Sequence, residues 1–282
     1  MVLISILMAA YHSDATILAA INGVRAQIHA DWELIIASDC GSDYLALCRA
    51  NGIVDERIRM VATSAIGSGP SAARNAAMAA AHGDYMAILD SDDVWLPAKL
   101  SALLPLAMTA GLACDNTYAV QPGGGTIATA YPIAEAAYEI DALTMMNSGM
   151  PHFPLFRAEL AGAGYRDDLR FAEDVVFNME LITRAAAMTL LPQPLTHYIQ
   201  RPDSASNGAG AWRRAEAAYE RILAILAREE LAVPVGQHDR ITDAIAAKRD
   251  FNRAFGGAVE AGNTMSFQDF AAARGEHWKN NV

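Results

Sequence analysis

Three carboxylates stand together directly after a short apolar run. Met86-Ala-Ile-Leu leads into Asp90, and Asp92 and Asp93 follow after one serine. Carboxylates packed this closely repel one another unless a cation lies between them, and their hard oxygens suit Mg²⁺ or Mn²⁺, which keep open positions for substrate phosphates. A cation held there can neutralise a diphosphate group as it leaves. The alternative is a solvated acidic turn that caps the next helix, and the preceding apolar run and Trp95 weigh against it.

A second acidic pair, Glu173 and Asp174, lies at the start of a predicted helix over residues 171–187. The helix dipole favours acids in a first turn, so this pair alone does not indicate catalysis. His197 lies in a short predicted strand over residues 195–200. A single histidine in a strand is either a packed side chain or a ligand, and the sequence leaves both interpretations open.

The elements that must position these side chains alternate along the first 115 residues. Apolar runs predict buried strands at residues 2–8, 33–37, 58–62 and 85–89. Alanine-rich stretches predict helices at residues 14–30, 44–51, 71–81 and 97–111. We expect Asp14 to cap the first of these helices and Pro97 to lie in the first turn of the last.

This alternation predicts an α/β fold with a mostly parallel sheet flanked by helices. Ligands of such sheets bind at the carboxyl ends of the strands, so polar groups after the first, second and fourth strands should converge at one edge. Later segments differ in pattern. Short strands and loops are predicted up to residue 203, a loop over residues 204–210, and two amphipathic helices within residues 211–282.

Charge and composition exclude several classes of protein. The net charge of −11 argues against a general nucleic-acid binder, which needs a basic surface. Three cysteines without a CxxC pair predict neither a disulfide framework nor a zinc ribbon, and they fit a reducing compartment. No apolar run reaches the length of a membrane span, so we expect a cytoplasmic protein, at most peripheral at the inner face of a membrane.

Several motifs taken together resemble the family 2 glycosyltransferases of GT-A fold. That family has an A-R-N helix start followed by a hydrophobic strand that ends in D-x-D-D, and the segments Ala73-Arg74-Asn75 and Asp90-Ser-Asp92-Asp93 are similar to these. The first strand, the turn over residues 33–43 and the Glu173-Asp174 pair also resemble motifs of the family. The resemblance covers roughly residues 1–205.

The resemblance implies a role for each matching residue. The side chains expected at the nucleotide sugar are Ala9, Tyr11, Asp39, Arg74, Asp90 and Ser91. The first three and Arg74 should lie near the base, and Asp90 near the ribose. Asp92 should bind the metal, with His197 as a late contact, and Asp174 should be the general base.

The acceptor should meet Trp95, His152 and Glu173, and residues 116–210 should form the acceptor-binding half of the domain. Residues 1–115 should form the nucleotide-sugar half, so that residues 1–210 make the catalytic domain and residues 211–282 a helical extension. These helices could cover the acceptor site or form a homodimer.

The resemblance implies an inverting, Mn²⁺- or Mg²⁺-dependent transfer of a hexose-type sugar to a glycan, a lipid-linked or a small-molecule acceptor. The sequence lacks the Q-x-x-R-W pattern of processive synthases, so we expect one sugar per event. Ser38 departs from the family, which usually has an acid there, and this makes UDP a default for the nucleotide.

Three other functions fit parts of the sequence. Gly67-Ser-Gly69-Pro-Ser-Ala72 matches a dinucleotide-binding fingerprint, but it follows the third strand and Pro70 stiffens it. A sugar-phosphate nucleotidyltransferase needs a glycine-rich basic loop after the first strand, where this chain has Met-Ala-Ala-Tyr-His-Ser-Asp. A degenerate protein that binds a nucleotide sugar without turnover remains open, although the acids at 90, 92 and 174 argue against it.

Overall fold

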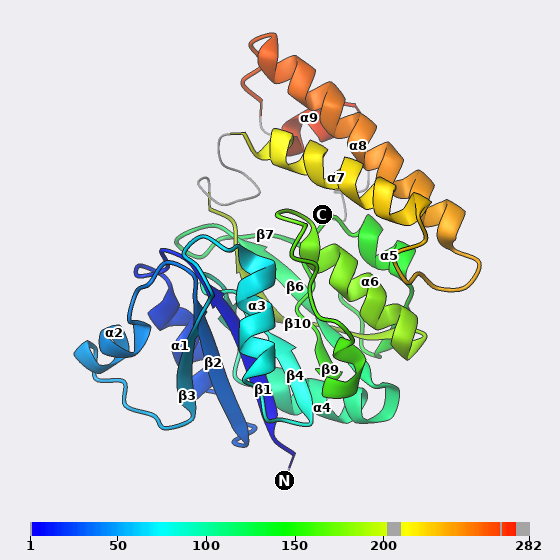
Figure 1. Ribbon diagram of the computed structural model, residues 1–282. Coiled ribbons are helices and arrows are strands. Elements are labelled where there is room, and N and C mark those ends of the chain that lie inside the picture. The colour runs from blue at the N-terminus through cyan, green and yellow to red at the C-terminus, as the bar shows by residue number, and fades with distance from the viewer. Residues whose placement is uncertain (1, 202–209, 266, 275–282) are drawn as a thin grey trace.

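A computed structural model describes residues 2–201, 210–265 and 267–274 of the chain. Ten strands of this part form one mixed sheet with helices on both faces, as Figure 1 shows, so the predicted α/β class is confirmed. Ser204 and most of the predicted loop over residues 204–210 lie outside the described residues.

The strands are β1 (Ile4–Ala10), β2 (Trp32–Ser38), β3 (Ile58–Ala62), β4 (Tyr85–Ile88), β5 (Val94–Trp95), β6 (Leu112–Val120), β7 (Thr126–Thr129), β8 (Tyr138–Ile140), β9 (Leu155–Arg157) and β10 (Met188–Ile199). The helices are α1 (Ile17–Arg25), α2 (Tyr44–Ala50), α3 (Pro70–Ala79), α4 (Lys99–Ala110), α5 (Ala142–Asn147), α6 (Glu173–Ala185), α7 (Ala211–Ala227), α8 (His238–Glu260) and α9 (Phe267–Ala273). A short 3-10 helix spans Ala158–Ala161.

The sheet has the order β3-β2-β1-β4-β9-β6-β10-β5, with β7 and β8 paired beside β6 and β10. The four strands β3, β2, β1 and β4 run parallel, as predicted for residues 1–115. Strand β9 is antiparallel to both β4 and β6, whereas β6 and β10 are parallel to each other. The parallel half therefore ends in a common edge at which ligand-binding side chains can meet.

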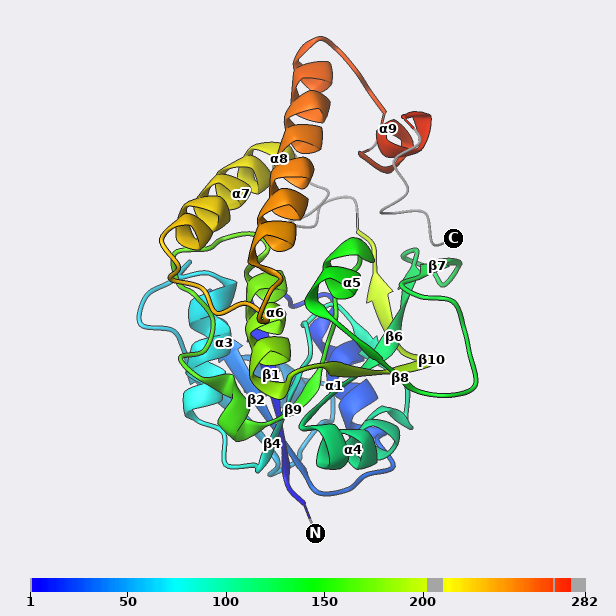
Figure 2. The same cartoon turned by 90° about the vertical axis from the view of Figure 1, so that its right-hand side faces the viewer.

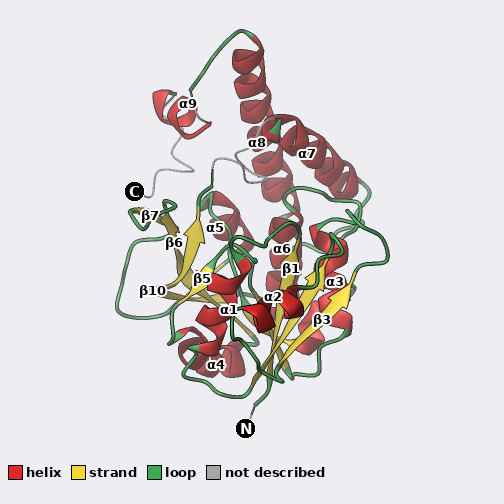
Figure 3. Ribbon diagram, turned by 90° about the vertical axis from the view of Figure 1, so that its left-hand side faces the viewer, coloured by secondary structure: helices red, strands yellow, loops and turns green. Residues whose placement is uncertain are grey.

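Alternate side chains of β1 enter two different cores, one on each face of the sheet. Leu7 packs in the core covered by α3, α5 and α6, whereas Ile6 and Met8 pack in the core covered by α1, α2 and α4. Figures 2 and 3 show these two helical layers from opposite sides. Burial on both faces explains why the strand is a continuous apolar run.

The first helix is shorter than predicted, and the prediction that Asp14 caps it is wrong. The chain first makes a turn in which the Ser13 carbonyl accepts hydrogen bonds from the N–H groups of Thr16 and Ile17. Thr16 is therefore the N-cap residue, and the helix ends at Arg25.

Helix α4 begins at Lys99, so the prediction that Pro97 lies in its first turn is also wrong. The Pro97 carbonyl instead accepts a hydrogen bond from the N–H of Ile28 and ties the end of the α1 segment to the chain before α4.

Strand β10 is much longer than the predicted segment of residues 195–200. Pro192 and Pro194 lie within it, and prolines normally argue against a strand because they lack an N–H donor. The register against β6 shifts between Leu191 and Thr196, so the chain passes both prolines as an irregularity and then resumes pairing.

The C-terminal helices pack on the body of the protein. Ile222 and Ile225 of α7 and Ile241 and Ile245 of α8 belong to the same core as α6. Arg221 of α7 also binds Asp168 with its Nε, at 2.8 Å. Figures 1 and 2 show α7 and α8 at the end of the molecule toward which β1 runs. The predicted domain boundary at residue 210 remains a prediction.

Among the described residues, no helix combines the length and apolar character that a bilayer crossing requires. The three cysteines are free thiols in the structure.

A buried ion pair fixes β10 against its neighbours. Lys99 at the start of α4 and Asp115 of β6 are completely enclosed and bind each other, and Lys99 Nζ also donates to Thr196 Oγ1 at 2.8 Å. Asp115 Oδ2 accepts from the Leu195 N–H at 3.0 Å and from Thr196 Oγ1 at 2.8 Å. This network sets the course of the strand segment that leads toward the acidic turn.

Replacing Lys99→Met should destabilise the fold by about 3–5 kcal/mol, because it leaves a buried carboxylate without its cation. The double variant Lys99→Met with Asp115→Asn should recover part of that loss, since it removes the uncompensated charge. Urea unfolding of both variants measures the two free energies. A double variant no more stable than the single one would contradict this account.

Candidate functional site

The polar groups after the first, second and fourth strands meet at one edge of the sheet, as predicted. Ser13, which follows β1, shares a hydrogen bond of 2.7 Å with Ser91, which follows β4. The Ser13 N–H donates to the Tyr44 hydroxyl at 3.0 Å, and the Asp39 N–H donates to the Ala10 carbonyl at 2.9 Å. The turn that carries the acidic cluster is therefore fastened to the ends of β1 and β2.

Arg74 bridges the two acidic motifs. Its Nη2 donates to Asp90 at 2.7 Å and its Nη1 donates to Glu173 at 2.8 Å. The guanidinium is buried and lies 5.2 Å from the centre of the Tyr165 ring. Burial works against its charge, but the charge of Asp90 outweighs this and holds the arginine pKa well above its ordinary value. A fixed positive charge therefore joins the acidic turn to the first turn of α6.

The other two acids of the turn differ in exposure. Asp92 Oδ2 accepts from Arg201 Nη2 at 2.8 Å, and both side chains are partly exposed. Asp93 is buried, and its Oδ1 accepts from the Ile199 N–H at 2.9 Å. Burial raises the pKa of both carboxyls, and the neighbouring charge of Asp90 raises them further. Asp92 is thus the acid of the pair that faces solvent and exogenous cations.

Asp174 lies beside this cluster in the first turn of α6, behind Ala172, whose backbone is left-handed at φ 57°. Burial and, second, the charge of Glu173 raise the pKa of Asp174 to about 6. Two tyrosines from distant segments, Tyr198 of β10 and Tyr219 of α7, have pKa values raised by burial and also by the charge of Asp174. Burial is therefore the main reason that this carboxyl resists ionisation.

Asp39 does not have the role predicted for it. Its buried carboxylate accepts from Thr63 Oγ1 at 2.7 Å and from the N–H groups of Ser68 and Gly69, both at 2.8 Å. We correct the prediction of a direct base contact, because this carboxylate instead holds the loop before α3. Tyr11, by contrast, is exposed just beyond β1.

The neighbouring Ser38 donates to the Ser42 carbonyl at 2.9 Å and is buried as well. Ala9 is half-buried near the end of β1, where its side chain packs against the core below α3.

The prediction that Trp95 and His152 line an acceptor site is wrong, because both are buried at 1% and 5% exposure. The Trp95 ring packs against Lys99, and His152 Nε2 lies 2.8 Å from the Tyr131 hydroxyl. Burial lowers the pKa of His152 to about 4, which keeps it neutral. Glu173 is also enclosed and committed to Arg74, so its predicted acceptor contact is replaced by a structural one.

Among the described residues, no three His, Cys, Asp or Glu side chains gather as a complete metal site. The ring of His197 lies edge-on to Tyr118 of β6, with centroids 5.9 Å apart, and its contact with a metal stays a prediction. Asp93 Oδ2 is buried without a hydrogen-bond partner beside the partly exposed Asp92. This donor set fits a hard divalent cation that takes one or two carboxylates and completes its shell with water and phosphate oxygens.

Sequence patterns missed three tyrosines whose pKa values the charge of Asp174 helps to raise. Tyr165, Tyr198 and Tyr219 come from a loop, a strand and a C-terminal helix, and no local motif marks them. Tyr219 stands at helical spacing with Ala215 and Ile222, a pattern that predicts packing and gives no sign of a catalytic neighbour.

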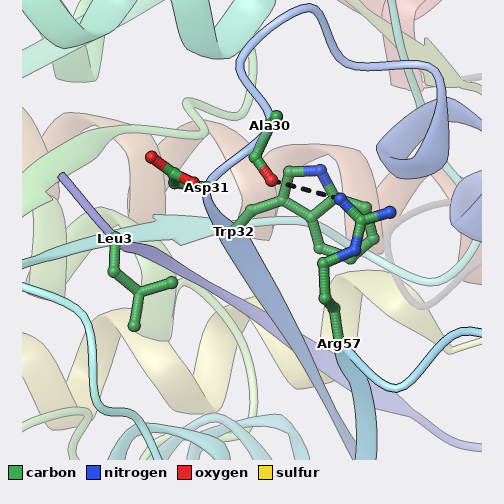
Figure 4. Close-up of a pocket in the computed structure, with 5 residues that line it drawn as sticks. All are labelled: Leu3, Ala30, Asp31, Trp32 and Arg57. Atoms are coloured by element: carbon green, nitrogen blue, oxygen red, sulfur yellow. Dashed lines mark hydrogen bonds between the residues drawn. The ribbon is translucent and has the colours of Figure 1, made fainter. Parts of the chain in front are cut away.

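A hollow at the opposite end of the sheet, drawn in Figure 4, is separate from this site. It is lined by Leu3, Ala30, Asp31, Trp32 and Arg57 at the starts of β1 and β2. The Arg57 guanidinium lies 3.7 Å from the centre of the Trp32 ring and donates to the Ala30 carbonyl. These contacts stabilise the amino ends of the strands.

Comparison with known proteins identifies the family. The family model described as glycosyl transferase family 2 matches residues 5–163, more than half of the chain. The chain belongs to glycosyltransferase family 2. It is 36% identical over 106 residues to the UDP-Glc:alpha-D-GlcNAc-diphosphoundecaprenol beta-1,3-glucosyltransferase WfgD of Escherichia coli, covering 38% of this chain and 41% of that protein.

A second family 2 relative is the succinoglycan biosynthesis protein ExoO of Rhizobium meliloti, at 36% identity over 126 residues, covering 44% of this chain and 36% of that protein. The chain thus spans less than half the length of these two relatives.

Solved structures confirm the GT-A fold. TarS of S. aureus, residues 1–349 in complex with UDP-GlcNAc, superposes with a TM-score of 0.66 at 18% identity, covering 88% of this chain and 72% of that one. The mannosyltransferase PcManGT from Pyrobaculum calidifontis, in complex with GDP-Man and Mn²⁺, gives 0.57 at 14% identity, covering 96% and 78%. The predicted GT-A fold of this family 2 chain, with helices after the sheet domain, is therefore correct.

Replacing Arg74→Met should destabilise the protein by about 3–5 kcal/mol, because Asp90 and the buried Glu173 then share a site without their common cation. Arg74→Lys keeps the charge but cannot span both carboxylates, so its loss should be smaller. Urea unfolding at pH 7.5 measures both. As a control, Arg213→Met breaks an exposed pair with Glu260 and should cost about 0.5 kcal/mol or less. Equal losses at positions 74 and 213 would contradict the bridging role.

Proposed function

We propose that the protein transfers a sugar from a nucleoside-diphosphate sugar, UDP-linked by preference, to a hydroxyl group of an acceptor, with inversion at the anomeric carbon. The observation that carries this proposal is the bridge from Asp90 through Arg74 to Glu173, which holds the acidic turn beside Asp174. A donor diphosphate at the turn would then have its sugar directed toward the carboxylate that can deprotonate the acceptor.

The proposed mechanism assigns each step to a side chain already in place. Asp174 takes the proton from the acceptor hydroxyl, and the acceptor oxygen attacks the anomeric carbon from the side opposite the diphosphate. Inversion follows because a single displacement occurs.

A divalent cation, Mn²⁺ or Mg²⁺, would be held by Asp92 with the adjacent Asp93 and would supply charge neutralisation for the departing diphosphate. Tyr11 is exposed where the base would lie, and Ala9, Asp90 and Ser91 border the same edge. Asp39 would act by positioning the loop before α3.

Relatives support a role in the synthesis of surface glycans. The name of WfgD refers to a diphosphoundecaprenol-linked sugar, and the name of ExoO refers to succinoglycan biosynthesis. A UDP-GlcNAc complex and a GDP-Man complex occur among the structures of similar fold, so both nucleotides belong in any test. We propose that the chain adds single sugars in the cytoplasm or at the inner face of a membrane, consistent with its three free thiols.

A nucleotidyltransferase is less well supported. The segment after β1 is held by Ser13 and Tyr44 and contains no lysine or arginine that could bind a triphosphate. A binding protein without turnover differs from the proposed enzyme in one respect, which is whether Asp174 acts on an acceptor.

Equilibrium dialysis against labelled UDP-sugars and GDP-sugars tests the donor site. We expect one nucleotide sugar to be retained in the presence of Mn²⁺ and its affinity to fall at least about tenfold in Asp92→Asn, because a metal ligand is lost. Asp239→Asn, on exposed α8 surface, is the matched control and should bind like the wild type. Binding that ignores both Mn²⁺ and Asp92 would refute the cation role, and no binding at all would refute the donor site.

Asp174→Asn should lower the transfer rate by at least about 10²-fold, because the general base is gone. In the wild type the base must be ionised, so the rate should fall as pH drops through about 6, the raised pKa of Asp174. Initial rates between pH 5 and 8 measure both effects, with any acceptor that supports turnover. A rate unchanged down to pH 5 would contradict the assignment.

The same substitution has a second consequence that needs no acceptor. A carboxyl whose pKa is raised by folding stabilises the protein below its unfolded pKa and loses that contribution as pH rises through about 6. Asp174→Asn should therefore be more stable than the wild type at pH 8, by up to about 3 kcal/mol, and equal to it near pH 3.5. Thermal unfolding at the two pH values separates a lost base from a damaged fold.

A further inference from the structure

Two arginines neutralise the acidic turn, and they are held very differently. Arg74 is buried and bonded to two carboxylates, so its bond to Asp90 is fixed by the fold. Arg201 follows β10, and its contact with Asp92 joins side chains that are 34% and 27% exposed. An ion pair that reaches solvent contributes less to stability than a buried one. Asp92 can therefore give up Arg201 for another partner more easily than Asp90 can give up Arg74.

The end of β10 holds Arg201 over the acidic turn. The Ile199 N–H donates to Asp93 Oδ1 at 2.9 Å, and Arg201, two residues on, donates to Asp92 Oδ2. Two successive acids are thus bound by the same short stretch of chain. A guanidinium placed in this way reduces the repulsion that burial and Asp90 impose on Asp92.

We propose that Arg201 is an internal counter-ion of the donor site, which occupies the Asp92 oxygen until a divalent cation and a nucleoside diphosphate take its place together. This inference rests on the proposed function. The cation alone must displace Arg201 and break the bond between its guanidinium and Asp92. When a diphosphate arrives with the cation, the released guanidinium gains a more highly charged partner that suits its planar donors.

The exchange makes the binding of cation and nucleotide interdependent. The cation frees Arg201 to bind the diphosphate, and the diphosphate compensates for the Arg201–Asp92 bond that the cation breaks. It also gives Arg201 opposite effects on two affinities. The side chain should weaken the binding of the cation by itself and strengthen the binding of the nucleotide in the presence of the cation. A merely structural side chain would change both affinities in the same direction.

Isothermal titration calorimetry of the full chain with Mn²⁺ alone, and with UDP at saturating Mn²⁺, tests the proposal. In Arg201→Gln we expect Mn²⁺ alone to bind about three- to fivefold more tightly, the range of an exposed ion pair. UDP should bind about tenfold more weakly, as expected for a lost charge-assisted hydrogen bond. Arg201→Lys, which keeps the charge without the planar fork, should fall between the wild type and Arg201→Gln on both affinities.

Arg170→Gln is the matched control, because Arg170 is an exposed arginine before α6 that donates to the Gly67 carbonyl. Arg170→Gln should change the Mn²⁺ affinity less than twofold. If it changed the affinity as much as Arg201→Gln does, the Arg201 effect would be one of general charge, and the proposal would be overturned. Parallel losses or no change in Arg201→Gln would also overturn it while leaving the proposed function intact. A wild type that binds neither Mn²⁺ nor UDP would instead refute the proposed function, and the inference with it.

Discussion

Repulsion among carboxylates is the constraint on which the rest of this structure depends. Asp90, Asp92 and Asp93 share one turn, and Glu173 and Asp174 lie beside them on α6. Burial strengthens the repulsion because little water is present to screen it. The fold meets this constraint with one buried arginine from α3, which the crossover between β3 and β4 places between the two acidic groups. Without that cation neither the turn nor the start of α6 could keep its position.

The same constraint explains why the acids have different properties. Glu173 is enclosed and bonded to Arg74, so it acts as a structural anchor, whereas Asp93 is enclosed with its Oδ1 bonded and its Oδ2 without a partner. Asp92 keeps a solvent-facing side, which suits a cation that arrives with its substrate. Asp174 is buried beside another acid, and its raised pKa places a usable base near neutral pH. One local excess of negative charge thus provides an anchor, a cation ligand and a base.

Residue patterns predicted the sheet well because β1, β2 and β4 are buried on both faces and stand out as continuous apolar runs. The convergence of the polar groups that follow β1, β2 and β4 was also predictable, since parallel strands end at one edge. The bridge by Arg74, the loop contacts of Asp39 and the burial of Trp95 and His152 were not. The bridge joins residues 99 apart in sequence, and the Asp39 contacts depend on the path of a loop 24 to 30 residues further on. The burial of the two rings depends on which side of the chain they face, and local patterns encode none of this. Most of β10 was not predicted because it contains two prolines. The strand passes them through an irregular register against β6, which is a tertiary feature.

The most direct test of this account is to locate the cation. A crystal of the protein grown with UDP and Mn²⁺ and measured near the manganese absorption edge would show the metal as an anomalous peak. The account predicts a peak within coordination distance of the Asp92 carboxylate, roughly 2.0–2.3 Å as for hard cations on oxygen ligands, and on the same side as the UDP phosphates. Bound UDP with no peak at Asp92, or a peak at another group of acids, would contradict it.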